Sequence, residues 1–259
     1  MERSKTKKKH SNMDFSILIT VLALCAIGLV MVFSASYYYA QEKWGDALLY
    51  VRKQSIYLAL SIPVMLLLTR VDYKVLEKLK TPGLLLSVAL LIAVLFFGKE
   101  ANGAKRWLVI AGQSIQPSEV AKFGMILYMC SFMSSKQHLM KDFVKGLVPM
   151  LMVMGLICAL VMAQPNMSMA VIIGMMGIVM LYIGGADVKH IAVLMVCGIL
   201  LFILFAWLEP YRFARLASFR DPWADPDKSG YQLIQSLYAL GAGGLFGQGL
   251  NNSRQKLLY

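Results

Sequence analysis

Residues 83–97 read GLLLSVALLIAVLFF, a run of fifteen residues with one hydroxyl group and no charge. A helix on the surface of a soluble protein carries a polar stripe at the helical period, and this run has none. Six further apolar runs accompany it, at roughly 15–35, 54–69, 118–133, 147–163, 168–184 and 191–208. With their polar flanks, they approach the ~20 residues that a helix needs to cross a bilayer. The sequence therefore predicts an all-α fold: a polytopic integral membrane protein with seven transmembrane helices.

The composition agrees with a membrane protein and gives its orientation. Of the 259 residues 58% are hydrophobic and 15% are charged, whereas soluble domains carry about 25% charged residues. With the N-terminus inside, thirteen Lys and Arg fall in inside segments and six in the outside connections 36–53 and 98–117. We therefore expect 1–13 to be a basic cytoplasmic N-terminus, 14–208 a seven-helix membrane region and 209–259 an extracellular loop. The net charge of +12 is attributed to this bias and not to nucleic-acid binding.

Neither the cysteines nor the histidines indicate a metal site or a cofactor. The four cysteines, at positions 25, 130, 158 and 197, all lie inside apolar runs, with no CxxC pair and no neighbouring histidine. We interpret them as small apolar side chains.

Charged residues stand unexpectedly at the start of the fourth apolar run. Glu119 and Lys122 follow Pro117 in SIQPSEVAKFG, residues 114–124. In one interpretation Glu119 complements the helix dipole at the outer interface and pairs with Lys122, which extends towards water. In the other, these two residues line an outward-facing cavity with Arg106 and Lys53, and the three cations suit an anionic ligand such as a phosphate ester.

A second polar segment, AQPNMSMA at 163–170, separates the fifth and sixth runs. It predicts a tight helical hairpin in which Pro165 ends one helix and Asn166 caps the next. The alternative is a turn that enters the same cavity, with the amide of Asn166 presented to a ligand.

The segment 209–259 is too rich in Trp, Tyr, Leu and Gly for a linker, and ordered loops of this size are commonly functional. Its glycines do not form GxGxxG, so a nucleotide-binding fingerprint is rejected. YQLIQSLYAL, residues 231–240, predicts an interfacial helix, and the Gly-rich run after it predicts a bend or a re-entrant segment that lines a cavity. The cations of this segment suit anionic lipid headgroups or an anionic lipid-linked substrate; they include Arg212, Arg215, Arg220, Arg254 and Lys256.

Three stretches resemble the FtsW/RodA/SpoVE (SEDS) family: GLVMVFSAS at 28–36, SIQPSEVAK at 114–122 and the whole of 219–259. DPWADPDKSGYQ and GGLFGQGLNNSRQK are most similar to the FtsW and SpoVE branch. The resemblance implies a helical membrane protein of about ten spans with a large extracellular loop after the seventh. It also implies a peptidoglycan glycosyltransferase of the plasma membrane that polymerises lipid II into polyprenyl-linked glycan. Such proteins act with a class B penicillin-binding protein in cell division, sporulation or cell shape, at the septum in the first two cases.

The resemblance also assigns substrate-binding residues: Arg106, Glu119, Lys122, Lys53 and Asn166. Glu119 and Lys122 match the PSExxK motif of the family, and Arg106 matches its arginine before that helix. Gln164 and Pro165 match a QPD turn in which Asn166 replaces the aspartate, and Lys53 replaces an arginine.

The proposed catalytic aspartate of the family belongs to an LPExxxDF motif expected directly after Tyr259. We therefore expect a C-terminally truncated fragment that is inactive alone, from a longer enzyme of the family. No cofactor is expected, and dependence on a divalent cation is left open. Two other functions stay open, a lipid II flippase and a non-catalytic scaffold of the division machinery.

Overall fold

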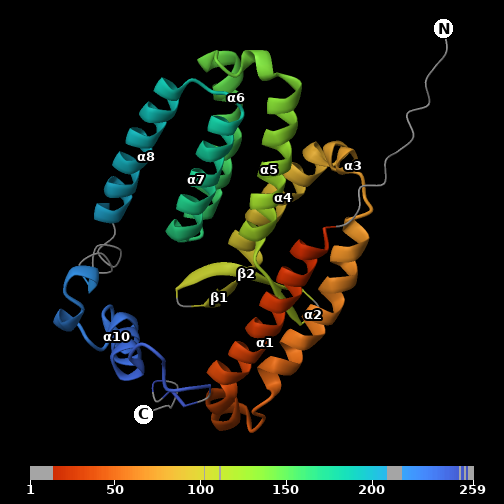
Figure 1. The fold of residues 1–259 in the computed structure, drawn as a ribbon. Coiled ribbons are helices and arrows are strands. Elements are labelled where there is room, and N and C mark those ends of the chain that lie inside the picture. The colour runs from red at the N-terminus through yellow and green to blue at the C-terminus, as the bar shows by residue number, and fades with distance from the viewer. Residues whose placement is uncertain are drawn as a thin grey trace. The chain divides into compact units, whose positions relative to one another are not determined.

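The computed structural model describes residues 14–101, 103–110, 112–208, 218–250, 252–253 and 255. The predicted basic N-terminus and the cations at 212, 215, 254 and 256 lie outside the described residues. The chain divides into two compact units, one formed by 1–71 with 211–259 and the other by 72–210 (Figure 1). Each unit is described by itself below.

All seven predicted membrane segments form helices: α1 (Phe15–Trp44), α2 (Leu49–Leu68), α4 (Lys80–Phe97), α5 (Pro117–Ser135), α6 (Val148–Met162), α7 (Met167–Ile183) and α8 (Val188–Leu208). Among the described residues, five helical segments are long and apolar enough to cross a membrane: α1, α2, α4, α8, and α6 together with the π-helix η2 (Phe143–Leu147) before it. The helix α7 is shorter, with 17 residues. The helix α5 is outside the five and begins with a charged turn. The polytopic helical membrane fold is thus confirmed, and membrane crossing by α5 and α7 stays a prediction.

In the first unit, α1 and α2 form an antiparallel hairpin (Figure 1). Asp14 caps α1 by accepting from the backbone N–H of Ser16, and Gly45 ends it at φ 69°. The helix runs nine residues beyond the predicted 35, through a tyrosine-rich segment of the kind enriched at membrane interfaces. Arg52 pairs with Asp46 at 2.7 Å across the turn. Both helices expose large apolar side chains such as Ile27, Leu60 and Leu67, as a lipid-facing surface requires.

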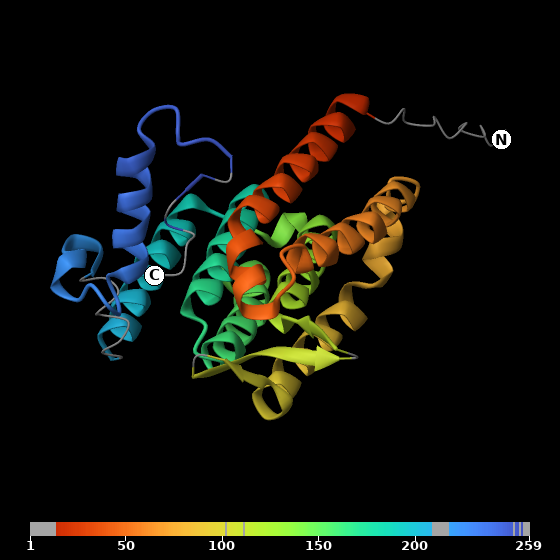
Figure 2. The same cartoon turned by 90° about the horizontal axis from the view of Figure 1, so that it is seen from below.

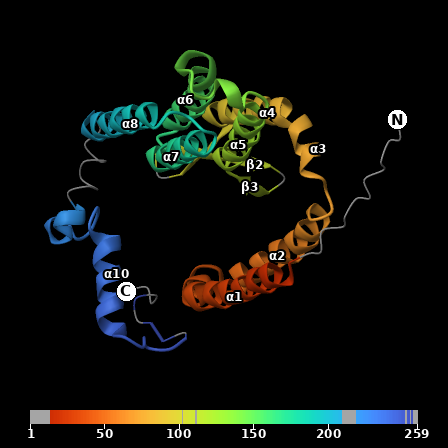
Figure 3. The same ribbon diagram turned by 45° about the horizontal axis from the view of Figure 1, so that its top comes forward.

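The second unit is a bundle of α4, α5, α6 and α7 with α8 beside α7 (Figure 3). Its core is continuous and rich in methionine, with Met125 and Met129 of α5 fully buried. The helices α4 and α5 approach closely because position 124 is a glycine: a Cβ there would lie 2.3 Å from Oγ of Ser87. The short helix α3 (Tyr73–Lys78) precedes α4, and Lys80 of α4 donates to Oγ of Ser131 on α5 at 2.9 Å. The 3₁₀ helix η1 (Gln137–Leu139) follows α5.

A small antiparallel sheet joins α4 to α5, which the sequence did not predict. Its strands β1 (Lys99–Ala101), β2 (Ala104–Ile110) and β3 (Gln113–Ile115) lie in that order across one end of the bundle (Figure 2). Gly103 and Gly112 form the turns with φ of 72° and 78°, a backbone region that favours glycine. Lys99 pairs with Trp107 and Glu100 with Lys105, so Arg106 is the extra residue of a β-bulge.

The tail in the first unit contains the 3₁₀ turn η3 (Pro222–Ala224) and α10 (Tyr231–Gly243). The helix predicted at 231–240 is therefore confirmed, and positive φ at Gly244, Gly247 and Gly249 shows that the chain bends after it. Re-entry of this segment into the membrane stays a prediction. The interfacial position of α10 stays a prediction.

Candidate functional site

The first turns of α5 place a charged pair at one end of the bundle. Pro117 takes the first position of the helix, where its missing N–H costs nothing. Nζ of Lys122 lies 2.8 Å from Oε2 of Glu119, with 22% of the Lys122 side chain and 55% of the Glu119 side chain exposed. The predicted pair is confirmed, with the cation the more buried partner.

Arg106 contacts the turn between α6 and α7. Its Nε donates to the carbonyl oxygen of Gln164 at 3.3 Å, and its Nη2 donates to that of Pro165 through a short hydrogen bond. The bulge in β2 gives Arg106 this direction, because bulges re-aim a side chain relative to its strand. The sequence suggested a cation facing a ligand, and the structure shows a guanidinium that binds two successive backbone carbonyls.

The α6–α7 turn is also held from inside the bundle. Gln164 is 1% exposed, and its Nε2 donates to the carbonyl oxygen of Leu91 on α4 at 3.3 Å. Its Oε1 is buried with no hydrogen-bond partner among the described residues. The turn is therefore fixed on one side by a strand and on the other by a helix.

Asn166 stands at the N-cap position of α7, as predicted, but the prediction that its side chain caps the helix is wrong. Its φ of −116° and ψ of 64° depart from the extended geometry in which an N-cap side chain reaches the next N–H groups. The residue is 6% exposed, so a buried amide stands directly after the two carbonyls that Arg106 binds.

The α6–α7 turn and the charged first turns of α5 both contact the helix α4. Ser87 lies four residues before Leu91 and so on the same face of α4. Its single hydroxyl proton is shared between the carbonyl oxygen of Gly83, at 2.7 Å in α4 itself, and that of Val120 on α5, at 3.3 Å. The face of α4 that holds Gln164 thus also holds the first turns of α5. Ser118 lies fully buried in those turns, and its Oγ has no partner among the described residues.

The structure thus brings Arg106 to the turn that carries Asn166, and Glu119 to Lys122. Lys53 is exposed on α2, in the other compact unit, and its membership of the site stays a prediction. Sequence reasoning missed the side-chain contacts of Gln164 and Ser87 and the burial of Ser118. For the two serines the signal was a hydroxyl in an apolar context, since a buried polar group needs a partner; Gln164 was matched to the family's turn without a contact being assigned to it.

No group of three or more His, Cys, Asp and Glu that could hold a metal ion occurs in the part of the chain that the structure describes. All four cysteines are unpaired.

The helical bundle, its apolar helices and the charged turn at one end define a multi-pass membrane protein. Residues 15–259 match the family model of the cell cycle proteins FtsW, RodA and SpoVE, and the chain belongs to this family. It is 36% identical over 253 residues to Stage V sporulation protein E of Bacillus subtilis, covering 97% of this chain and 69% of that protein. It is 40% identical over 248 residues to a protein of Coxiella burnetii named "Probable peptidoglycan glycosyltransferase FtsW", covering 95% and 67%.

Two solved structures are similar to the fold. A chain from the structure titled "Structural coordination of polymerization and crosslinking by a peptidoglycan synthase complex" matches with a TM-score of 0.71 and 28% identity. That match covers 90% of this chain and 67% of the other. The rod shape determining protein RodA of Thermus thermophilus matches with a TM-score of 0.61 and 23% identity, covering 95% and 93%, and supports the fold alone.

Proposed function

We propose that the protein is a peptidoglycan glycosyltransferase that polymerises lipid II into glycan strands at the outer face of the plasma membrane. The observation that carries the proposal is family membership over residues 15–259. The similarity to a chain of a peptidoglycan synthase complex supports it. A half-buried cation held at the end of a membrane bundle fits a substrate with an anionic diphosphate.

In the reaction, the hydroxyl oxygen of an acceptor sugar forms a bond to the anomeric carbon of the donor. The bond from that carbon to the polyprenyl diphosphate breaks, and the diphosphate leaves with the electron pair. The proton of the acceptor hydroxyl passes to a general base.

The described residues supply electrostatic stabilisation of the leaving group. Lys122 is positioned to bind the negative charge that develops on the diphosphate, and a fixed cation in a partly dry site is most effective there. Glu119 lies 2.8 Å from Lys122, and this ion pair supports our assignment of the carboxylate to positioning the cation. Arg106 shapes the neighbouring turn.

The proposal includes a location and a partner. The distribution of Lys and Arg favours a cytoplasmic N-terminus and an external segment 209–259. A class B penicillin-binding protein that cross-links the new strands is the expected partner, at the septum formed in division or sporulation.

The test is glycan polymerisation from lipid II by the purified full-length protein with its transpeptidase. Lys122→Ala is expected to lower the rate by about 10²–10³, the effect of removing one fixed charge-stabilising group from an active site. Lys136→Ala, at the opposite end of α5, is the control and should leave the rate unchanged. Normal polymerisation by the Lys122→Ala protein would reject the assigned site. Transport of lipid II without polymerisation would support the flippase. Absence of both transport and polymerisation would support the scaffold.

A further inference from the structure

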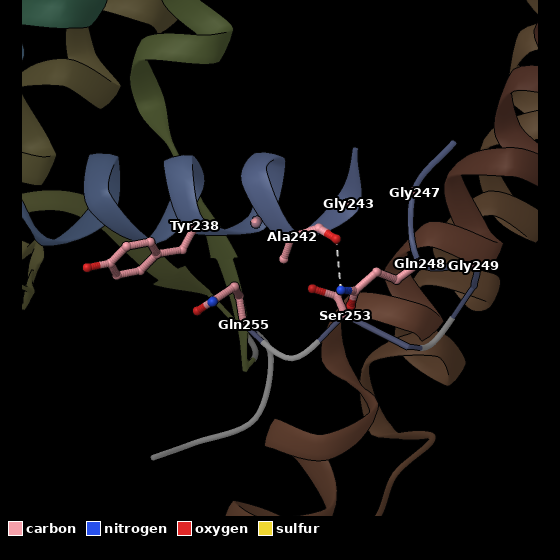
Figure 4. Close-up of a pocket in the computed structure, with 9 residues that line it drawn as sticks. Tyr238, Ala242, Gly243, Gly247, Gln248, Gly249, Ser253 and Gln255 are labelled. Carbon is pink, nitrogen blue, oxygen red and sulfur yellow. Dashed lines mark hydrogen bonds between the residues drawn. The ribbon is translucent and has the colours of Figure 1, made fainter. Parts of the chain in front are cut away.

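The tail contains a pocket that the site above does not use. It lies between the C-terminal half of α10 and the Gly-rich loop that follows, and its volume is about 400 Å³. Tyr238 and Gly243 line it from the helix, and Gln248, Ser253 and Gln255 line it from the loop (Figure 4). This volume is within the range of about 300–1,000 Å³ that is usual for small-molecule sites.

We propose that this pocket binds an uncharged saccharide, the sugar portion of the lipid-linked substrate or of the growing glycan. The identity of the ligand rests on the function proposed above. The chemical class, however, follows from the pocket itself.

Among the described residues that line the pocket, two alanines are apolar and the polar side chains are uncharged. They offer a phenol, a hydroxyl and two carboxamides, and none of the described residues that line it carries a charge. Cationic side chains are the strongest partners of a diphosphate, and carboxylates are the strongest ligands of Mg²⁺ and Ca²⁺; the described lining offers neither. A sugar hydroxyl is both donor and acceptor, and a carboxamide can satisfy both functions. The ring of Tyr238 adds an apolar face of the kind that packs against the C–H groups of a pyranose.

The groups that line the pocket are held in place before a ligand binds. Nε2 of Gln248 donates to the carbonyl oxygen of Ala242 at 3.0 Å, which fixes the amide against the end of α10 (Figure 4). The side chain of Asn252 donates to the carbonyl oxygen of Gln248 at 3.1 Å. The ring of Tyr238 lies against that of Trp223, with centroids 6.3 Å apart. Such preorganisation lowers the entropic cost of binding.

The loop can fold back over the helix because of its glycines. Gly247 and Gly249 have φ of 73° and 87°, which other residues rarely adopt. The glycines that do not form a nucleotide fingerprint therefore build one wall of this pocket. Gly243 has open space at its Cβ position, with no atom within 4 Å, so a large side chain there would extend into that space.

The helix α10 offers matched controls. Tyr231 and Tyr238 are both 53% exposed on this helix, but only Tyr238 is among the residues that line the pocket. Gly241 and Gly243 both have open space at the Cβ position, but only Gly243 lines the pocket. Removal of the ring of Tyr238 can therefore be compared with removal of the ring of Tyr231. Introduction of a large side chain at Gly243 can be compared with the same substitution at Gly241.

The experiment uses the full-length protein in nanodiscs and a soluble, uncharged β-1,4-linked N-acetylglucosamine tetramer as probe. Binding is measured by calorimetry. Tyr238→Ala should weaken binding about three- to tenfold, the range that one aromatic contact contributes. Gly243→Phe should abolish it, while Tyr231→Ala and Gly241→Phe should bind as the wild type does. Absence of saturable binding to the wild type, or equal effects of each variant and its control, would overturn the inference.

A second arm separates the two sources of sugar and the two proposals. If the lipid-linked monomer occupies the pocket, Gly243→Phe raises the KM for lipid II; if the growing glycan does, it shortens the product strands at unchanged KM. Normal KM and strand length in that variant, with intact polymerisation, would reject the pocket and leave the proposed function standing. If the wild-type protein binds the sugar tetramer through the pocket but does not polymerise lipid II, the proposed function is rejected and the pocket is retained.

Discussion

Replacing Arg106 by alanine removes both hydrogen bonds between β2 and the α6–α7 turn. A hydrogen bond from a charged donor contributes about 1.5–3 kcal/mol when it is buried. Arg106 is only half-buried, so we discount the two bonds together to about 1–3 kcal/mol. That free energy corresponds to a five- to 150-fold lower equilibrium constant between this turn conformation and its alternatives.

The kinetic consequence depends on whether Arg106 acts through the turn or on the substrate. If it acts through the turn, Arg106→Ala should lower kcat for glycan polymerisation by up to that factor and leave the KM for lipid II nearly unchanged. Arg106→Lys should not restore the rate, because an ammonium group lacks the planar fork that reaches two successive carbonyls. Lys105→Ala, the exposed neighbour on the same strand, is the control.

Two further measurements distinguish positioning from general destabilisation. Hydrogen exchange at the amide of Asn166, which donates to the carbonyl of Val161 at 3.3 Å, should become faster in Arg106→Ala while α8 keeps its protection. The effects of Arg106→Ala and Asn166→Ala on kcat should be non-additive, as expected for residues that act as one unit. Additive losses, a raised KM and unchanged exchange would refute the reasoning and return Arg106 to the role of a diphosphate ligand.

Three other predictions concern packing, pH and topology. Gly124→Ala should destabilise the bundle by about 1–3 kcal/mol in thermal unfolding, because its Cβ would overlap Ser87, and Ser87→Gly in the same protein should recover part of the loss; an unchanged Tm would contradict the close approach of α4 and α5. The backbone N–H of Lys145 donates to Asp142 and lowers the pKa of its carboxyl group, so the ionised carboxylate stabilises the fold above its unfolded pKa of about 3.8. This contribution is lost as the pH falls below that value. The decrease of Tm on acidification should therefore be smaller in Asp142→Asn than in the wild type. In a cysteine-free protein, cysteine at Lys228 should react with an impermeant maleimide added outside intact cells and cysteine at Ser135 should not; the reverse pattern would invert the topology.

The sequence predicted the membrane helices well because their signal is local. An uncharged run such as 83–97 has no other stable solution in a bilayer than a helix, since its backbone must satisfy itself. The pair of Glu119 and Lys122 was equally predictable, because residues three apart on a helix are neighbours. Asn166 was placed at the correct position with the wrong role, since its residue type favours a cap but the backbone geometry of a hairpin decides where the amide points.

The sheet and the roles of Arg106 and Gln164 were not predicted, for two different reasons. Strands of three residues are too short for a period of two to stand out, although the Asn-Gly pair at 102–103 is a known hairpin signal and gave a hint. The contacts of Arg106 and Gln164 join residues 58 and 73 positions away in the chain. Such pairings depend on how the helices pack, and no spacing within one segment encodes them.

The bulge in β2 makes the connection between α4 and α5 sensitive to length in a specific way. Deleting one residue of Lys105–Trp107 would regularise the pairing with β1 and shift the guanidinium away from the carbonyls it holds. Residues added next to Gly103 or Gly112 would lengthen a turn and leave the ladder unchanged. In a scan of single-residue insertions and deletions across 98–116, changes in the two turns should therefore preserve activity, whereas changes in β2 should abolish it. The length of the connection between α4 and α5 thus fixes the position of the Arg106 side chain, and the connection cannot be exchanged for another linker of similar length.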